Sequence, residues 1–299
     1  MQLFNNEYNW YKGNLHTHTT VSDGALPPEE VLRLYKQNGY DFIALTDHDK
    51  LSKPGVAEGM LMLSGIELAY NDMETRVAYH IVGINVDETT QDDIAALKPE
   101  WAKKPQIMID HIKARGGFAV LCHPDWSLMS IHDAMALEGY EAIEIMNSVS
   151  DPEARGNSSN FCDSLIARTK KPFLTVASDD AHFYNGDACY SSVYVNAKSL
   201  TTEDILEAIR AGRFYSSCGP KFKSINIEKG MITVNASPVK LIRFMSDSFY
   251  TPHRRRLCDT CANSGTYPIN PNDNFVRIEL VDANGRRAWS QYIDVREYK

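Results

Sequence analysis

The stretch FIALTDHD, residues 42–49, is an apolar run followed by potential metal ligands, and this pattern is the most informative about the fold. Its first five residues, FIALT (42–46), form a short apolar run of the kind found in buried strands. The run leads directly into Asp47, His48 and Asp49, whose side chains can all bind a metal ion. The stretch therefore predicts a buried strand with potential metal ligands at its carboxyl end.

The same kind of apolar run recurs along the chain as far as residue 178. The further runs are LMLSGI (61–66), VAYHIVGI (77–84), GFAVLC (117–122), AIEIM (142–146) and FLTVAS (173–178). Helix-like stretches lie before, between and after the runs, at 27–39, 99–117 and 201–212 respectively, and Thr201 or Thr202 is suited to cap the last one. This alternation predicts an α/β domain over about residues 10–220.

After Gly219 and Pro220 the pattern of apolar and polar residues changes. Short alternating runs are separated by turn signals such as Glu228-Lys229-Gly230, which is typical of antiparallel strands. We therefore expect two domains, a catalytic domain at 1–220 and a C-terminal β-sandwich-like domain at 221–299.

Composition and charge limit the classes of partner. The 299 residues are 43% hydrophobic and 23% charged, and 39 acidic against 31 basic residues give a net charge of −8. General nucleic-acid binding is not expected from that charge, whereas a small anionic substrate held by metal is compatible with it. The N-terminal residues resemble no secretory signal, so we expect a cytoplasmic protein. No apolar stretch is long enough to span a membrane, so we expect no membrane partner. The six cysteines are dispersed along a long chain without such a signal, so we expect free thiols and not disulfides. The sequence does not indicate an oligomeric state.

Residues that can bind metal fall at or near the ends of almost all the apolar runs. FIALT leads into His48, LMLSGI into Glu67, GFAVLC into His123, and FLTVAS into Asp179-Asp180-Ala181-His182; His80 lies inside another run, and His16-Thr17-His18 precedes them all. In parallel α/β folds the carboxyl ends of strands converge on one site. Polar residues are common where strands leave a core, but that explains one or two such positions and not six of the nine histidines.

The ligand types indicate the chemistry. Imidazoles and carboxylates without a thiolate suit Mn²⁺, Fe²⁺ or Zn²⁺ in a hydrolytic centre, and so many ligands require two or three ions. Such ions lower the pKa of bound water and deliver hydroxide. The residues leave open whether that hydroxide attacks a phosphate ester or an amide, ester or carbamate carbonyl.

The motifs together resemble the PHP (polymerase and histidinol phosphatase) superfamily of metal-dependent hydrolases. The matching motifs, in family order, are His16-Thr17-His18, Ser22-Asp23-Gly24, Thr46-Asp47-His48-Asp49, Gly65-Ile66-Glu67, His80, Cys122-His123-Pro124 and Asp180-Ala181-His182. The resemblance covers roughly residues 10–220. It implies a distorted (β/α)₇ barrel.

The resemblance also implies where the ions bind. One ion would lie on His16, His18, Glu67 and Asp180, a second on Glu67, His80 and His123, and a third on Asp23, His48 and His182. Catalysis is assigned to His48, Asp180 and His182. Where relatives usually have Ser-Asp-Ala-His, this chain has Ser-Asp-Asp-Ala-His, so the ligand is assigned to Asp180 by its spacing and Asp179 to a supporting role.

The last part of the chain is similar to the carbamate-hydrolase-like (CehA/McbA) branch of that superfamily, in AIRAGRFYSSCGP (208–220) and DANGRRAWS (282–290). We expect a phosphoesterase acting on a small phosphorylated metabolite, such as a nucleotide or sugar phosphate. The alternative is an amide, ester or carbamate hydrolase that uses the same metal centre.

Several residues have competing interpretations. Asn147, together with Glu144 before it, ends a run where substrate should enter, and Arg155 could bind a phosphate, so Asn147 and Arg155 are the predicted substrate-binding residues. Asp47 and Asp49 either orient imidazoles or cap a turn. Cys258-Asp259-Thr260-Cys261 has the spacing of a zinc knuckle but lacks a second ligand pair, so we interpret it as a loop.

Overall fold

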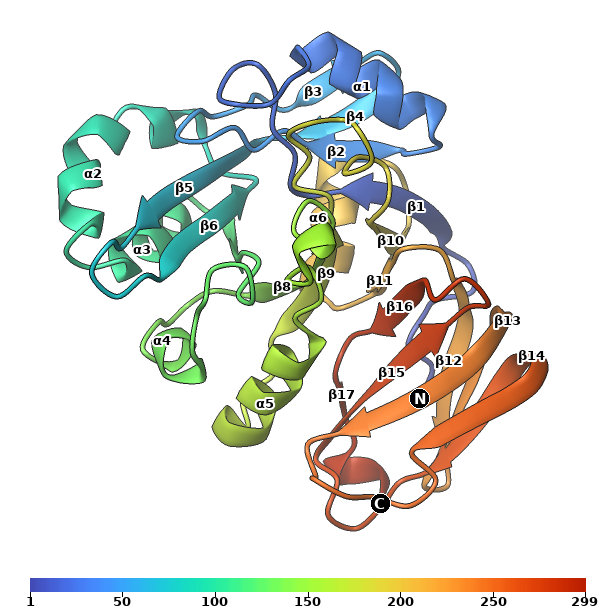
Figure 1. The fold of residues 1–299 in the computed structure, drawn as a ribbon. Helices are drawn as coiled ribbons and strands as arrows, with labels where there is room; N and C mark the ends of the chain where they lie inside the picture. The colour runs from blue at the N-terminus through green and yellow to red at the C-terminus, as the bar shows by residue number, and fades with distance from the viewer. The chain divides into compact units, whose positions relative to one another are not determined.

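The computed structural model describes residues 1–299, except for the side chains of Thr90, Asp259 and Thr260. The chain forms two compact units (Figure 1). The larger unit comprises Lys12–Leu165 and Val176–Ser192, and the smaller unit comprises Met1–Tyr11, Ile166–Thr175 and Val193–Lys299. The unit that contains residues 221–299 is thus more extensive than the predicted C-terminal domain, and the division into domains at residue 220 stays a prediction.

The larger unit is a mixed α/β structure with strands in two sheets. Its first group of strands has the order β1 (Asn9–Asn14), β2 (Phe42–Ala44), β4 (Met60–Leu63), β3 (Gly55–Ala57), in which β1, β2 and β4 are parallel. The second sheet has the order β5 (Gly65–Asn71), β6 (Ala78–Ile84), β7 (Phe118–Leu121), β8 (Ala142–Asn147), β9 (Leu174–Ser178). All six apolar runs thus contain strands, and the run at 61–66 is divided between β4 and β5.

The directions of the strands differ from the parallel arrangement that the sequence suggested. β5 and β6 are antiparallel, as are β6 and β7, whereas β7 and β8 are parallel. In the described part of the chain these pairings form open sheets, and the closed seven-stranded barrel is not confirmed.

The helices of the larger unit lie between its strands. They are α1 (Pro28–Gln37), α2 (Ile94–Trp101), α3 (Gln106–Ala114), α4 (Ile131–Met135) and α5 (Ser159–Thr169), with short 3-10 helices η1 (Glu88–Gln91) and η2 (Asp151–Glu153). The prediction of one helix at 99–117 was wrong, because α2 ends at Trp101 and α3 begins after Pro105. Proline lacks the backbone N–H that would continue a helix, so it stands at the start of α3.

The smaller unit is an antiparallel β structure with one helix. It contains β10 (Ser192–Ala197), α6 (Thr202–Arg210), β11 (Phe214–Ser217), β12 (Phe222–Glu228), β13 (Met231–Ser246), β14 (Arg255–Pro268), β15 (Phe275–Val281), β16 (Arg287–Ser290), β17 (Ile293–Asp294) and η3 (Arg296–Tyr298). The strand order is β12-β13-β15-β16-β11-β10, with β14 on β13 and β17 on β15. This confirms the antiparallel character expected of the last 80 residues, and the Thr201 hydroxyl caps α6 by accepting from the Asp204 N–H at 3.3 Å.

Two further expectations bear on the smaller unit and on the whole chain. Cys258 and Cys261 lie in β14, so the prediction of a loop at these residues was wrong. The side chains of Asp259 and Thr260, which lie between them, are outside the described part of the protein. The six cysteines are thiols and not disulfides, as expected. Among the described helices, none has the length and apolar character that crossing a bilayer requires.

Candidate metal centre

All nine predicted metal ligands lie in the larger unit and surround one centre. His16 and His18 follow β1, Asp23 lies in the turn before α1, His48 follows β2, Glu67 is in β5, His80 is in β6, His123 follows β7, and Asp180 and His182 follow β9. The bridges Thr17↔Ala181 and His48↔Glu67 join these segments side by side. Local backbone pairing thus brings together residues that are up to 166 positions apart.

The most buried group of candidate ligands is His16, His18, Glu67 and Asp180. Their ligand atoms lie within 4.8 Å of one another. Asp180 Oδ1 is 3.1 Å from Nε2 of both His16 and His18, and Glu67 Oε2 is 3.1 Å from His18 Nε2. This is the set of residues that the resemblance assigns to the first ion.

A second group contains the residues assigned to the third ion. His18, Asp23, His48 and His182 also place their ligand atoms within 4.8 Å of one another. Asp23 Oδ1 is 3.5 Å from His182 Nε2, and Asp23 Oδ2 is 3.7 Å from His48 Nε2. Two neighbouring ion positions that share His18 are compatible with this geometry.

His80 and His123 lie on the other side of Glu67. Glu67 Oε1 is 3.1 Å from His80 Nδ1 and 3.6 Å from His123 Nε2. Glu67 pairs with Val82 across the antiparallel strands β5 and β6, so His80 is its diagonal neighbour on the same face. The antiparallel pairing explains why His80 reaches the centre from inside a strand.

Five of the six imidazoles in the centre have one ring nitrogen bonded to a partner, which leaves the other nitrogen facing the shared centre. The partners are Glu144 Oε1 for His16 Nδ1 (2.8 Å), Ser22 Oγ for His18 Nδ1 (3.3 Å), Asn71 Oδ1 for His80 Nε2 (3.1 Å), Ser127 Oγ for His123 Nδ1 (3.0 Å) and the Asp180 carbonyl for His182 Nδ1 (2.7 Å). Metal-binding histidines usually have such a partner on the nitrogen that does not bind the ion.

Buried polar atoms without hydrogen bonds test whether these residues fit metal ions. His48 Nδ1, Glu67 Oε2 and Asp180 Oδ1 are buried and make no hydrogen bond within the described part of the protein, although other ligand atoms lie about 3 Å away. Unsatisfied buried donors and acceptors are costly and rare. Their convergence at one point fits divalent ions, which bind imidazole nitrogen and carboxylate oxygen.

The electrostatics of the centre lead to the same conclusion. Burial lowers the pKa of His16, but Asp180 and Glu67 outweigh it and raise that pKa well above its usual value; the same balance raises the pKa of His18 to about 9. Burial opposes the ionisation of Glu67, yet the neighbouring imidazoles lower its pKa well below the usual range. The buried carboxylates thus favour positive charge at His16 and His18, and divalent cations would supply that positive charge instead.

The backbone at the centre is constrained. His123 and Asp180 have φ values of 27° and 52°, a left-handed conformation that residues other than glycine seldom adopt and that is concentrated at functional sites. Gly24 lies so close to the backbone of His18 and Thr19 that a Cβ there would come within 2.6 Å of it. The Ser22-Asp23-Gly24 turn therefore needs glycine at its last position to hold Asp23 beside His18.

Glu144 and Asn147 support the ligands from β8. Glu144 bonds His16 and also accepts from the backbone N–H of His123 at 2.8 Å. Asn147 Nδ2 donates to Glu144 Oε2 and to Asp180 Oδ2, both at 3.0 Å, and the side chain is fully buried. This geometry argues against the predicted substrate contact at Asn147 and gives that residue a positioning role.

The aspartates beside the ligands hold loops instead of imidazoles. Asp47 accepts from Thr19 and Ser22, so it caps the turn that carries Asp23. Asp49 pairs with Lys98. Sequence reasoning left the roles of both open, and the structure places neither against a histidine of the centre.

Asp179 is a buried acceptor for six donors. Three are the backbone N–H groups of Cys189, Tyr190 and Ser191, and three are the side chains of Asn14, Tyr35 and Ser148. Burial raises the pKa of Asp179 to about 6, against the lowering effect of these hydrogen bonds. Asp179 therefore fixes the segment that follows Asp180, and its expected support of the metal ligands stays a prediction.

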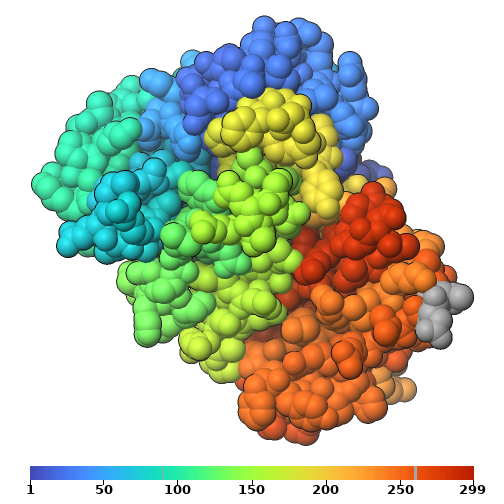
Figure 2. All heavy atoms as spheres, viewed as in Figure 1, coloured from blue at the N-terminus to red at the C-terminus, as the bar shows by residue number. Residues whose placement is uncertain are grey.

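A cavity of about 360 Å³ opens over the centre. It is lined by Asp23, His48, Glu67, Asn71, His80, His123, Trp126, Val149, Ser150, Glu153, Asp180, His182 and Phe183. Figure 2 shows the segment after β9 (yellow) at the surface beside the N-terminal residues of this unit (blue). Arg155, the other predicted substrate-binding residue, is exposed and is not among the lining residues.

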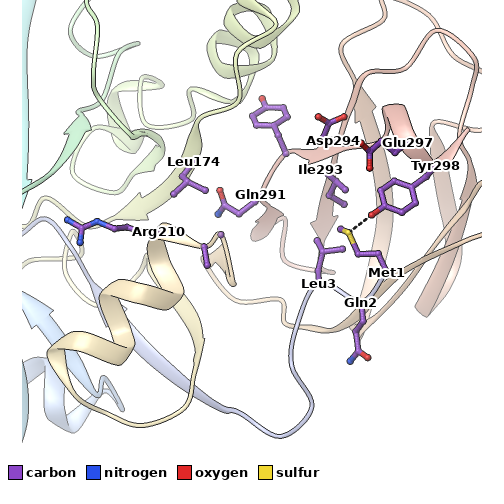
Figure 3. Close-up of a pocket in the computed structure, with 13 residues that line it drawn as sticks. Met1, Gln2, Leu3, Leu174, Arg210, Gln291, Ile293, Asp294, Glu297 and Tyr298 are labelled. Atoms are coloured by element: carbon purple, nitrogen blue, oxygen red, sulfur yellow. Dashed lines mark hydrogen bonds between the residues drawn. The ribbon is translucent and has the colours of Figure 1, made fainter.

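A second cavity, of about 510 Å³, lies in the smaller unit (Figure 3). Two of its polar side chains have partners in the protein: Gln291 bonds to both backbone groups of Thr175, and Asp294 pairs with Arg296. No cluster of candidate metal ligands is found there among the described side chains. The chemistry is therefore concentrated in the larger unit.

The sequence did not identify the partners of the imidazoles. Ser22 and Ser127 each follow a histidine by four residues, a spacing that could have suggested a local hydrogen bond. Asn71 and Glu144 had no such local signal, because they reach His80 and His16 only through the pairing of strands.

Comparisons with known proteins agree with this centre. A "5'-3' exoribonuclease" of Haemophilus influenzae is 33% identical over 105 residues, which are 33% of this chain and 38% of that protein. A "3',5'-nucleoside bisphosphate phosphatase" of Chromobacterium violaceum is 33% identical over 91 residues, 28% of this chain and 31% of that protein. The chain thus spans about a third of the length of these relatives.

One solved structure resembles the fold along most of its length. It is a two-domain protein from Bacteroides vulgatus whose description names a predicted PHP-like metal-dependent phosphoesterase, with a TM-score of 0.53 and 16% identity over 96% of both chains. At that identity the likeness concerns the fold. The family model of the PHP domain matches residues 14–178, which are more than half of the chain and include seven of the nine candidate ligands, all except Asp180 and His182. The chain therefore belongs to the PHP domain family.

Proposed function

We propose that this protein is a metal-dependent phosphoesterase that hydrolyses a small phosphorylated metabolite, such as a nucleotide or sugar phosphate. The observation that carries the proposal is the convergence of six imidazoles and three carboxylates, five of those imidazoles with the outer nitrogen bonded to a partner. The names of both curated relatives describe enzymes that act on phosphate esters.

The proposed cofactors are two or three divalent ions, Mn²⁺, Fe²⁺ or Zn²⁺, held by the nine residues and supported by a PHP-type barrel. Such ions would act as Lewis acids toward the phosphoryl group and lower the pKa of the attacking water. Within the protein, Glu144 fixes the tautomer of His16 by accepting its Nδ1–H, and Ser127 has the same function for His123.

The residues proposed for catalysis are His48, Asp180 and His182. The side chains of His48 and His182 are 27% and 19% exposed, whereas the other candidate imidazoles are almost completely buried. Both line the cavity, so a substrate that enters it meets these two imidazoles first. Asp180 lies beneath them, within reach of His16 and His18.

A second candidate function is an amide, ester or carbamate hydrolase of the CehA/McbA type, acting with the same centre. One observation favours it: none of the described residues that line the cavity is a lysine or arginine, so the cavity has no cationic side chain for a phosphate. The metal ions themselves would supply the positive charge for a phosphate, which is why the phosphoesterase is preferred.

An activity screen separates the two functions. Purified protein loaded with Mn²⁺ is assayed against a panel of phosphomonoesters, phosphodiesters and aryl carbamates, with Asp180→Asn as the inactive control. Hydrolysis of a phosphate ester that is lost in Asp180→Asn supports the proposal. Activity toward carbamates alone would replace it by the second candidate, and inactivity toward every ester and carbamate would refute both.

A further inference from the structure

The charges around the metal-centre cavity are distributed unequally. Its floor is formed by the buried ligands, and its outer part is formed by exposed or half-exposed residues, among them Trp126, Glu153 and Phe183. Glu153 is the one charged residue of the lining, in the described part of the chain, that is not a candidate ligand. The outer part of the cavity therefore carries a negative charge without a compensating cation.

Glu153 is held in place by a chain of hydrogen bonds from the centre. It lies in η2, where its backbone N–H donates to the Ser150 carbonyl at 3.2 Å. The Ser150 hydroxyl donates to Asn147 Oδ1 at 2.8 Å, and Asn147 in turn bonds Asp180. Hydrogen bonds thus link the backbone at Glu153 to the ligands, and the exposed Glu153 side chain lines the cavity.

Aromatic rings form another part of the outer cavity. The Trp126 ring lies 4.9 Å from the His123 ring, and the Phe183 ring lies 6.2 Å from the His182 ring. The Phe183 side chain is 65% exposed, so its ring is accessible to a ligand that enters the cavity. Such rings provide contact area for an apolar or aromatic group of a ligand.

We propose that the substrate is a phosphate ester with a single phosphate and an uncharged, apolar or aromatic alcohol group, and that Glu153 excludes substrates with a second phosphate. The inference rests on the proposed phosphoesterase function and specifies its substrate class. With the reacting phosphate at the ions, a second phosphate would lie in the outer cavity near the Glu153 carboxylate, where like charges repel. This selectivity would distinguish the protein from its relative that is named as a bisphosphate phosphatase.

The test compares two ligands that differ only in the second phosphate, phenyl phosphate and 1,4-phenylene bisphosphate. Their affinities for the Mn²⁺-loaded full chain are measured by calorimetry at low ionic strength, and their hydrolysis is measured in parallel. We expect the wild type to bind phenyl phosphate about tenfold more tightly, and Glu153→Gln to bring the two affinities within about twofold of each other. High salt should reduce the wild-type preference in the same direction.

Asp151→Asn is the matched control. Asp151 is an exposed acid of the same short helix, but it is not among the lining residues, so its replacement should leave the ratio of affinities unchanged. Equal affinities in the wild type, or an equal shift in both variants, would overturn the inference. Binding with the expected ratio but without turnover of any ester would contradict the phosphoesterase function and still support the charge selectivity, and failure to bind either ligand would overturn both.

Discussion

Five of the six imidazoles of the centre are oriented by a group that bonds the outer nitrogen, and these groups differ in how far they lie from the histidine in sequence. Ser22 and Ser127 are local, whereas Glu144 is 128 residues from His16. Eight of the nine candidate ligands were identifiable from residue type and from their position before, within or after the apolar runs, and Asp23 only from the resemblance to the PHP superfamily. The distant partners were not, because their contacts depend on how the strands pair.

Replacing Glu144 by glutamine should weaken the centre without unfolding the protein. Glutamine retains the size of the side chain but loses the carboxylate that accepts from His16 Nδ1 and from the His123 backbone. Metal affinity or activity should fall about 10- to 100-fold. Glu141→Gln is the control, since Glu141 pairs with Lys113 outside the centre. Metal affinity is measured by titration, and the same affinity in both variants would argue against the role of Glu144.

Replacing Asp179 by asparagine should reduce stability. The amide presents an NH₂ group to some of the six donors that the carboxylate accepts, which leaves buried donors unpaired. The free energy of unfolding should fall by about 3 kcal/mol. Urea denaturation measures the free energy of unfolding. The control is Asp92→Asn, which replaces an exposed aspartate and should change stability by less than about 0.5 kcal/mol. A similarly small effect of Asp179→Asn would contradict the role of Asp179 as a structural acceptor.

At the scale of helices and strands, the positions of the core strands were predictable and their directions were not. The apolar runs locate β2 and β5 to β9 because burial requires apolar side chains on both faces of such strands. A run of this kind carries no information on the direction of its neighbour, so the antiparallel β5-β6-β7 arrangement was missed. It accounts for the place of His80, which lies within β6 and not at a strand end.

The end of β13 should show a defined dependence on pH. Asp247 follows that strand, with a nearly buried side chain that accepts from Lys170 Nζ at 2.6 Å and from the backbone of Asn274 and Phe275. Burial opposes its ionisation, but these donors outweigh burial and lower its pKa to about 2. Because this value lies below that of the unfolded chain, the ionised carboxylate stabilises the fold above about pH 4, and the stabilisation is lost as the pH falls toward 2.

The variant Asp247→Asn should therefore be about 2 kcal/mol less stable than the wild type at pH 7. The difference should shrink between pH 4 and pH 2, as the wild-type carboxyl becomes protonated. Denaturation curves recorded from pH 7 to pH 3 provide the comparison. A stability difference that stays constant over that range would show that the charge of Asp247 is not what stabilises the end of β13.

In the molecule as a whole, the change in the pattern of apolar and polar residues near residue 220 indicated antiparallel strands, and the structure confirms antiparallel strands there. The same change could not show that Met1–Tyr11, Ile166–Thr175 and Val193 onward belong to the same compact unit, because contacts between distant segments leave no mark in local composition. The metal centre lies within the larger unit alone. Its ligands span residues 16–182, so the centre joins segments that are far apart in the chain.

The most direct test of the metal centre is the number of ions that the folded chain binds. The purified protein is reconstituted with Mn²⁺, freed of excess metal and analysed by plasma mass spectrometry, beside Asp180→Asn, which removes a carboxylate within reach of both His16 and His18. We predict two or three ions per wild-type chain and at least one fewer in the variant. Fewer than two ions per folded wild-type chain would contradict a multinuclear centre.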